Sequence, residues 1–164
     1  MLSWRFSTRL GTFSDMANYS IELARTSNPA ASLGTFQATA TPRRIKLYEC
    51  TVGQDNTPGD NTLKYVFQRF SAPGTSTAVT PQPLDLADAP ALSAAGQVNT
   101  VEPTYTAGAV LLVISVNQRA TFRWVAPPGG ELVVPATNNA GIGIATPVAG
   151  GTPTITGDLK IQEQ

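Results

Sequence analysis

Few side chains in this 164-residue chain could carry out chemistry, because it contains no histidine and a single cysteine, Cys50. Without histidine, neither a serine–histidine nor a cysteine–histidine nucleophile can be built, and imidazole metal sites are excluded. Zinc would need several cysteine or histidine ligands. Cys50 lies in the alternating segment RRIKLYECTV and has no partner for an intrachain disulfide, so we expect a small buried side chain.

Carboxylates are the remaining acid–base candidates, and six lie in or beside predicted loops: Asp55, Asp60, Asp85, Asp88, Glu102 and Glu131. A glycosidase would need two of them facing each other across a groove, and no aromatic-rich sugar platform accompanies them. Asp55-Asn56 and Asp60-Asn61 offer oxygen ligands to calcium but lack the spacing of an EF-hand loop, so a polar hairpin loop is the better interpretation.

Phosphate-binding glycine patterns are also missing. No GxxxxGK[ST] motif occurs, Gly129-Gly130 has no third glycine in place, and Gly141-Ile142-Gly143 opens no predicted helix. We therefore predict a protein with no catalytic residues, no metal and no cofactor.

Composition favours many short strands over long helices. Charged residues make up only 13 % of the chain, and 14 glycines and 13 prolines supply turns. The net charge is zero but uneven: residues 1–44 hold five arginines and two carboxylates, whereas residues 45–164 hold six basic and nine acidic residues. Basic residues do not cluster with aromatics, so we expect no nucleic-acid binding, and no apolar run is long enough for a membrane span.

Period-two alternation places the strands that must position any site. It predicts strands at 19–24, 36–40, 43–52, 62–71, 109–117, 120–125, 131–134, 141–146 and 153–163, with a weaker extended piece at 98–105. In 43–52 the pattern puts Ile45 and Leu47 on one face and Tyr48, Cys50 and Val52 on the other. Residues 72–83 are expected to be irregular. A short helix is expected from Pro90 to Ala95, with Asp88 as N-cap and Gly96 ending it.

The segment AVLLVISVNQRATFRWVAPPGGELVV, residues 109–134, is the most apolar. Its first strand is apolar on both faces, which predicts a central strand of a sandwich, or a strand whose outer face meets another subunit. Asn117-Gln118 is interpreted as a hairpin or a tight turn into the next strand. There Phe122 and Trp124 are expected in the core rather than in a ligand pocket, and Arg123, like Arg69, faces solvent or a partner.

The N-terminal residues 1–17 are interpreted as an arm outside a domain at 18–164. Residues 1–15 are rich in Arg and Ser, as in organellar transit peptides, but lack the apolar segment of a secretory signal. The apolar side chains of Trp4, Phe6, Leu10 and Phe13 need a partner surface, because an isolated arm cannot bury them. Arg5 and Arg9 would help such an arm dock onto an acidic neighbour.

Residues 42–164 resemble auxiliary head proteins of tailed bacteriophages, of the decoration or cement kind. The likeness is one of whole pattern: few charges, Thr-, Ala- and Gly-rich segments, and a strand–NQR–strand unit followed by PGGELVVP, then the strand PTITGDLKIQEQ. The strand pattern itself predicts an all-β antiparallel sandwich or barrel, and with the resemblance we expect a sandwich or jelly-roll-like body of about eight strands, with one short helix and an extended N-terminal arm.

The resemblance implies a structural virion protein, not an enzyme, that binds the outer surface of an assembled head and stabilises the major capsid protein. It also implies a homo-oligomer, with a trimer favoured, assembled in the host cytoplasm. The residues expected to contact the partner are those of the arm and its junction with the body: Trp4, Arg5, Phe6, Arg9, Leu10, Phe13, Arg43 and Arg44. Two alternatives remain: another structural virion part, such as a tail, fibre or head-completion component, or a ligand- or sugar-binding β-sandwich module in which Trp124 or Tyr105 faces a groove. A carboxylate pair in a cleft would instead indicate an enzyme.

Overall fold

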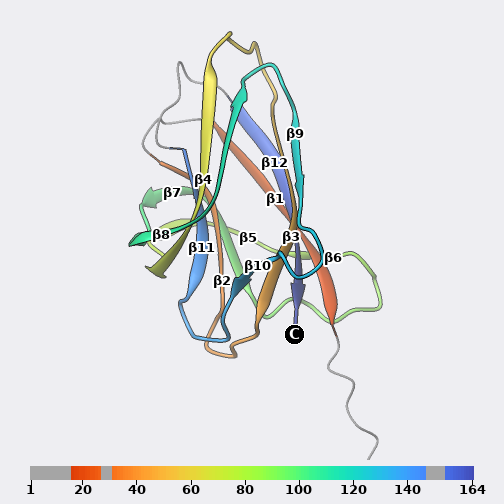
Figure 1. The fold of residues 1–164 in the computed structure, drawn as a ribbon. Helices are drawn as coiled ribbons and strands as arrows, with labels where there is room; N and C mark the ends of the chain where they lie inside the picture. Colours follow the sequence, from red (N-terminus) through yellow and green to blue (C-terminus); the bar gives the residue numbers. More distant parts are fainter. Residues whose placement is uncertain (1–15, 27–30, 147–153) are drawn as a thin grey trace, which may run out of the picture.

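The computed structural model describes residues 16–26, 31–146 and 154–164, and in these residues the chain is all-β. Two antiparallel sheets pack face to face as a sandwich (Figure 1). The predicted fold class is therefore confirmed at the level of an antiparallel β-sandwich. The described residues form twelve strands, more than the eight or so expected, and no helix.

Sheet A has the strand order β10-β3-β12-β1-β6, and β9 pairs with β3 beside β10. Its strands are β1 (Ala17–Thr26), β3 (Ile45–Gln54), β6 (Gln82–Pro83), β9 (Phe122–Val125), β10 (Leu132–Val134) and β12 (Thr154–Glu163). Sheet B has the order β5-β7-β2-β11-β4-β8. Its strands are β2 (Ser32–Gln37), β4 (Thr62–Ala72), β5 (Thr75–Val79), β7 (Ala94–Val101), β8 (Thr104–Asn117) and β11 (Gly141–Ala145).

The core lies between the two sheets and is built from alternate residues of their strands. The apolar residues of β1 and β12 that share one parity are buried, as predicted, because each strand turns one face to the core and the other to solvent. The large side chains in this core include Ile21, Leu23, Phe36, Tyr65, Phe67, Ile142, Ile144 and Ile155.

A β-bulge in β3 overturns the prediction that Ile45 and Leu47 lie on the opposite face from Cys50 and Val52. Leu47 lies opposite Ile161 of β12 and Glu49 lies opposite Lys160, which leaves Tyr48 as an extra residue. An extra residue exchanges the two faces of the strand beyond it. Ile45, Leu47, Cys50 and Val52 are consequently all buried in the same core.

The most apolar segment is neither a central strand nor half of a hairpin. β8 is the edge strand of sheet B and pairs with β4 alone. A turn follows, in which Ala120 N donates to Asn117 O at 3.0 Å, and the chain then crosses to sheet A, where β9 pairs with β3 (Figure 1). Phe122 and Trp124 nevertheless pack partly buried against the core, as predicted.

The predicted helix at 90–95 is wrong. Asp85 starts a turn five residues earlier, with Ala87 N donating to its Oδ1 at 2.9 Å and Asp88 N donating to its backbone oxygen at 3.0 Å. The chain then runs without a helix into β7, because the backbone N–H groups of Leu92 and Ser93 donate to the Glu163 carboxylate and not to a preceding turn. Earlier in the chain, residues 72–83 were expected to be irregular, but they hold two strands, β5 and β6.

Candidate partner-binding surface

Two of the eight predicted contact residues, Arg43 and Arg44, belong to the part of the chain that the structure describes. Both side chains are exposed, and they directly precede β3. The other six predicted contacts, Trp4, Arg5, Phe6, Arg9, Leu10 and Phe13, lie outside the described residues.

Arg43 and Arg44 lie at the end of the sandwich where β12 finishes and β1 begins. Arg44 and the last residue, Gln164, exchange backbone hydrogen bonds of 3.3 and 3.0 Å. Arg43 lines a hollow of about 150 Å³ together with Ala17, the first residue of β1, and Glu163. The start of β1 therefore lies next to Arg43.

The hollow beside Arg43 carries acidic as well as basic groups. Tyr19, Asp88 and Glu163 line it, and Tyr19 donates through its hydroxyl to Ala89 O at 2.9 Å. Burial raises the pKa of the Tyr19 phenol, and the negative charges of Glu163 and then Asp88 raise it further. The hollow therefore combines the guanidinium of Arg43 with the acidic side chains of Asp88 and Glu163.

Glu163 was missed by sequence reasoning because an acidic residue near the end of a polar-faced strand gives no local signal. Its side chain is buried, and its two carboxylate oxygens accept hydrogen bonds from Leu92 N at 3.1 Å and Ser93 N at 2.7 Å. These bonds connect the segment before β7 to the last strand of the other sheet and shape the hollow.

Arg44 lines a second hollow, with Arg69, Val133, Pro135 and Ala136. Arg69 donates from Nη1 to Val133 O at 2.6 Å, which directs its guanidinium toward β10. The alternation of its strand predicted that Arg69 faces solvent or a partner. That Arg69 lies beside Arg44 could be seen only in the tertiary structure. Two guanidinium groups in one hollow make this side of the surface favourable for a carboxylate-bearing partner.

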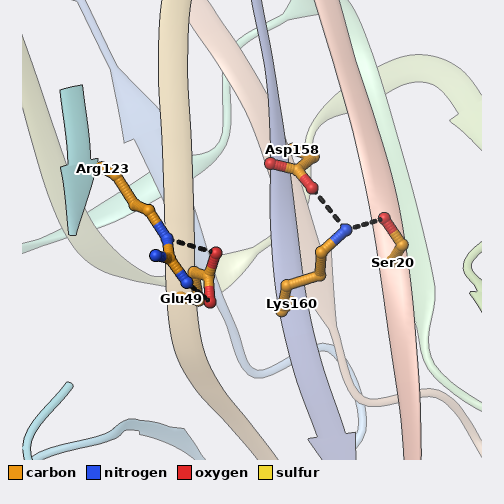
Figure 2. A network of polar contacts seen from close by, with 5 residues as sticks. All are labelled: Ser20, Glu49, Arg123, Asp158 and Lys160. Atoms are coloured by element: carbon orange, nitrogen blue, oxygen red, sulfur yellow. Dashed lines mark hydrogen bonds and ion pairs between the residues drawn. The ribbon is translucent and has the colours of Figure 1, made fainter. Parts of the chain in front are cut away.

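The outer face of sheet A carries a separate polar network (Figure 2). Arg123 donates from Nε and Nη2 to the two carboxylate oxygens of Glu49 at 2.7 and 2.8 Å. Lys160 donates to Ser20 Oγ at 2.8 Å and forms an ion pair with Asp158. These charges are compensated on the molecule, which distinguishes them from the exposed side chains of Arg43 and Arg44.

Three of the residues considered for chemistry are buried or hydrogen-bonded within the molecule. Cys50 is buried, as predicted, and burial raises the pKa of its thiol to about 12. Asp60 accepts from Asn117 Nδ2 at 2.6 Å, and Glu131 accepts from Gly129 N at 3.3 Å. Among the described residues, no three His, Cys, Asp or Glu side chains are grouped so that they could hold a metal ion.

One cluster combines the buried Ser32 with the half-buried Tyr105 and the exposed Glu102. Ser32 Oγ donates to Glu102 Oε2 at 2.5 Å and lies 2.5 Å from the Tyr105 hydroxyl. Burial raises the pKa of this phenol to about 12, although the hydrogen bond with Ser32 lowers it. Ser32 is fully buried, and its hydrogen bonds fasten the β7–β8 connection to β2. Neither Tyr105 nor Trp124 lines any of the four described hollows.

No helix in residues 16–26, 31–146 and 154–164 is long and apolar enough to cross a membrane. Comparison of the chain with protein-family models, with curated proteins and with solved structures gave no match.

Proposed function

We propose that this chain is a structural virion protein that binds the outer surface of an assembled bacteriophage head and stabilises its major capsid subunits. In this proposal the residues before β1 form an extended arm, which is one residue or more shorter than the expected 1–17 because Ala17 pairs with Glu163 in sheet A, and a jelly-roll-like body supports it. The observation that carries the proposal is the pair of exposed arginines, Arg43 and Arg44, beside the start of β1. The resemblance of residues 42–164 to head decoration proteins names the partner.

Physical reasoning supports a two-part contact. The arm supplies apolar side chains that have to be buried. Arg43 and Arg44 supply planar guanidinium groups, which can form bidentate hydrogen bonds with carboxylates. The hollows beside the two arginines give a partner loop shaped places to enter. A symmetrical head repeats the same docking site many times, so a modest contact becomes strong when the bound copies are linked.

The test uses heads of the encoding phage stripped of this protein, to which the purified chain is added back. The variant Arg43→Gln/Arg44→Gln should occupy fewer sites than the unchanged chain at the same concentration. Arg119→Gln is the matched control, because Arg119 is also exposed and comes two residues after β8. The end of β8 and the start of β1 lie at opposite ends of the sandwich (Figure 1). Equal occupancy by the double variant and the control would refute a role for the arginine pair.

A second variant tests the arm. Deletion of residues 1–15 removes no described strand, so the body should keep its far-ultraviolet spectrum while head occupancy falls. Unchanged occupancy would refute the arm as a contact. Counting the bound copies separates the proposal from other virion roles: a decoration protein is present in proportion to the capsid subunits, whereas a tail or head-completion component forms a single small ring.

A further inference from the structure

The outer face of sheet A holds a row of polar side chains beside the network of Figure 2. Asn18 of β1 lies opposite Gln162 of β12, and Gln162 lies opposite Lys46 of β3. Asn18 comes two residues before Ser20 and Gln162 two residues after Lys160, so both share the outer face with that network (Figure 2). The row therefore crosses three neighbouring strands in register.

The bulge in β3 adds an aromatic ring to this face. Leu47 and Cys50 are both buried in the core, so the two residues between them, Tyr48 and Glu49, both lie outward. A regular strand would present only one of the two residues on this face. The backbone oxygen of Tyr48 accepts a hydrogen bond from Ala126 N at 2.8 Å, which ties the bulge to the residue after β9. The bulge thus places the Tyr48 ring beside the polar row without displacing the ion pair of Glu49.

Tyr48 and the polar row line a hollow of about 290 Å³, which Glu131, just before β10, completes. Lys46 and Glu131 contribute one charge of each sign, so the lining is neutral overall. Gln164 Nε2 donates to Gln162 Oε1, and Gln162 Nε2 donates to Asn18 Oδ1, both at 3.3 Å. These hydrogen bonds orient the two amides before a ligand arrives, which lowers the entropy cost of binding.

We propose that this hollow binds one ring of an uncharged saccharide, with the Tyr48 ring against a C–H face of the sugar and the amides of Asn18 and Gln162 on its hydroxyls. Sugar hydroxyls both donate and accept, so they match amide, ammonium and carboxylate groups within one site. A charged ligand is disfavoured, because Lys46 and Glu131 would attract and repel it at the same time. A volume of about 290 Å³ is at the small end of small-molecule sites, roughly 300–1,000 Å³, which suits one ring rather than a long chain. This inference concerns the free protein and stands apart from head binding.

The test titrates the purified chain with D-glucose, D-galactose, D-mannose and N-acetylglucosamine and follows its backbone amides by NMR. At least one of these neutral sugars should give saturable shifts at the amides of the residues that line the hollow. Glucuronic acid and glucosamine, which each carry a charge, should bind more weakly than the best neutral sugar. The absence of saturable shifts with all four neutral sugars, or tighter binding of a charged one, would overturn the proposal.

Substitutions locate the bound sugar. Tyr48→Ala should raise the dissociation constant by roughly tenfold or more, because the sugar loses the ring on which it packs. Tyr48→Phe keeps the ring and should bind more tightly than Tyr48→Ala. Gln162→Met keeps the length of the side chain, removes the amide and should also weaken binding, which tests the site independently of the bulge.

Val125→Ala is the matched control for these variants. Val125 is 51 % exposed, lies opposite Glu49 on the same face of sheet A, and does not line the hollow. This variant should therefore bind the sugar as the unchanged chain does. Far-ultraviolet spectra identify the variants that remain folded. A folded Tyr48→Ala or Gln162→Met protein with unchanged affinity would overturn the proposal.

Discussion

The ring of Tyr105 lies against the backbone of Gly143, in the space that a side chain at position 143 would fill. A Cβ atom there would overlap the phenol oxygen and lie 2.9 Å from Cε1 of the ring. Tyr105 belongs to β8 and Gly143 to β11, with β4 between the two strands. The glycine therefore lets the tyrosine reach across the sheet to Ser32 of β2.

Gly143→Ala should lower the free energy of unfolding by about 1–3 kcal/mol, because the tyrosine ring must move away from its present position. The measurement is denaturant unfolding, with Tyr105→Ala as the second arm of a double-mutant cycle. In the Tyr105→Ala background the glycine substitution should cost much less, because the clash has gone. Equal costs in the two backgrounds would show that the ring does not set the effect.

Glu163→Gln should destabilise the protein by about 1–3 kcal/mol. The buried carboxylate accepts hydrogen bonds from two backbone N–H groups. The glutamine amide keeps only one oxygen acceptor and places an NH2 donor opposite the other N–H group, which loses its hydrogen bond. Amide hydrogen exchange at Leu92 and Ser93 should become faster, whereas exchange in β4 should change less. Glu22→Gln is the control, because Glu22 is exposed on the outer face of the same sheet. Unchanged exchange at Leu92 and Ser93 would contradict this role.

Arg123→Gln should raise the pKa of Glu49 toward its ordinary value. Hydrogen bonds from the Arg123 guanidinium hold this pKa below the usual 4.5, with help from its positive charge and that of Lys160. A lowered folded-state pKa means that the carboxylate stabilises the fold above about pH 4.5 and loses this contribution as the pH falls through the lowered value. Side-chain carboxyl chemical shifts in an acid titration measure the effect, and an unchanged midpoint in the variant would contradict it.

The alternation of apolar and polar residues was sufficient to predict which side chains are buried where a strand stays regular and faces the core on one side. In β12, Ile155, Leu159 and Ile161 share one parity and all are buried, as the alternation predicts. In β4, Tyr65 and Phe67 belong to the core between the sheets, while Phe70 is buried on the opposite parity. Period-two alternation reports such a strand directly, because its side chains alternate between two environments.

Local pattern failed where a distant segment decides the environment. The bulge at Tyr48 depends on how β3 aligns with β12, more than a hundred residues later in the chain. The expected helix at 90–95 is replaced because the buried Glu163 takes the N–H groups of Leu92 and Ser93. Each of these contacts joins residues that are far apart in sequence, so no window of neighbouring residues contains the information.

By itself the sequence determined that the chain is rich in strands and has no histidine. It also determined that the single cysteine, Cys50, is buried and that two basic residues, Arg43 and Arg44, are adjacent. Only the tertiary structure decided which strands became edges. The apolar run of β8 looked like a sandwich centre, yet its pairing leaves it at the rim of sheet B with Val113 exposed. An apolar sequence shows that both faces of a strand favour burial. Backbone pairing between strands far apart in sequence decides whether the strand lies inside a sheet, where its own chain buries it, or at an edge, where its side chains stay exposed.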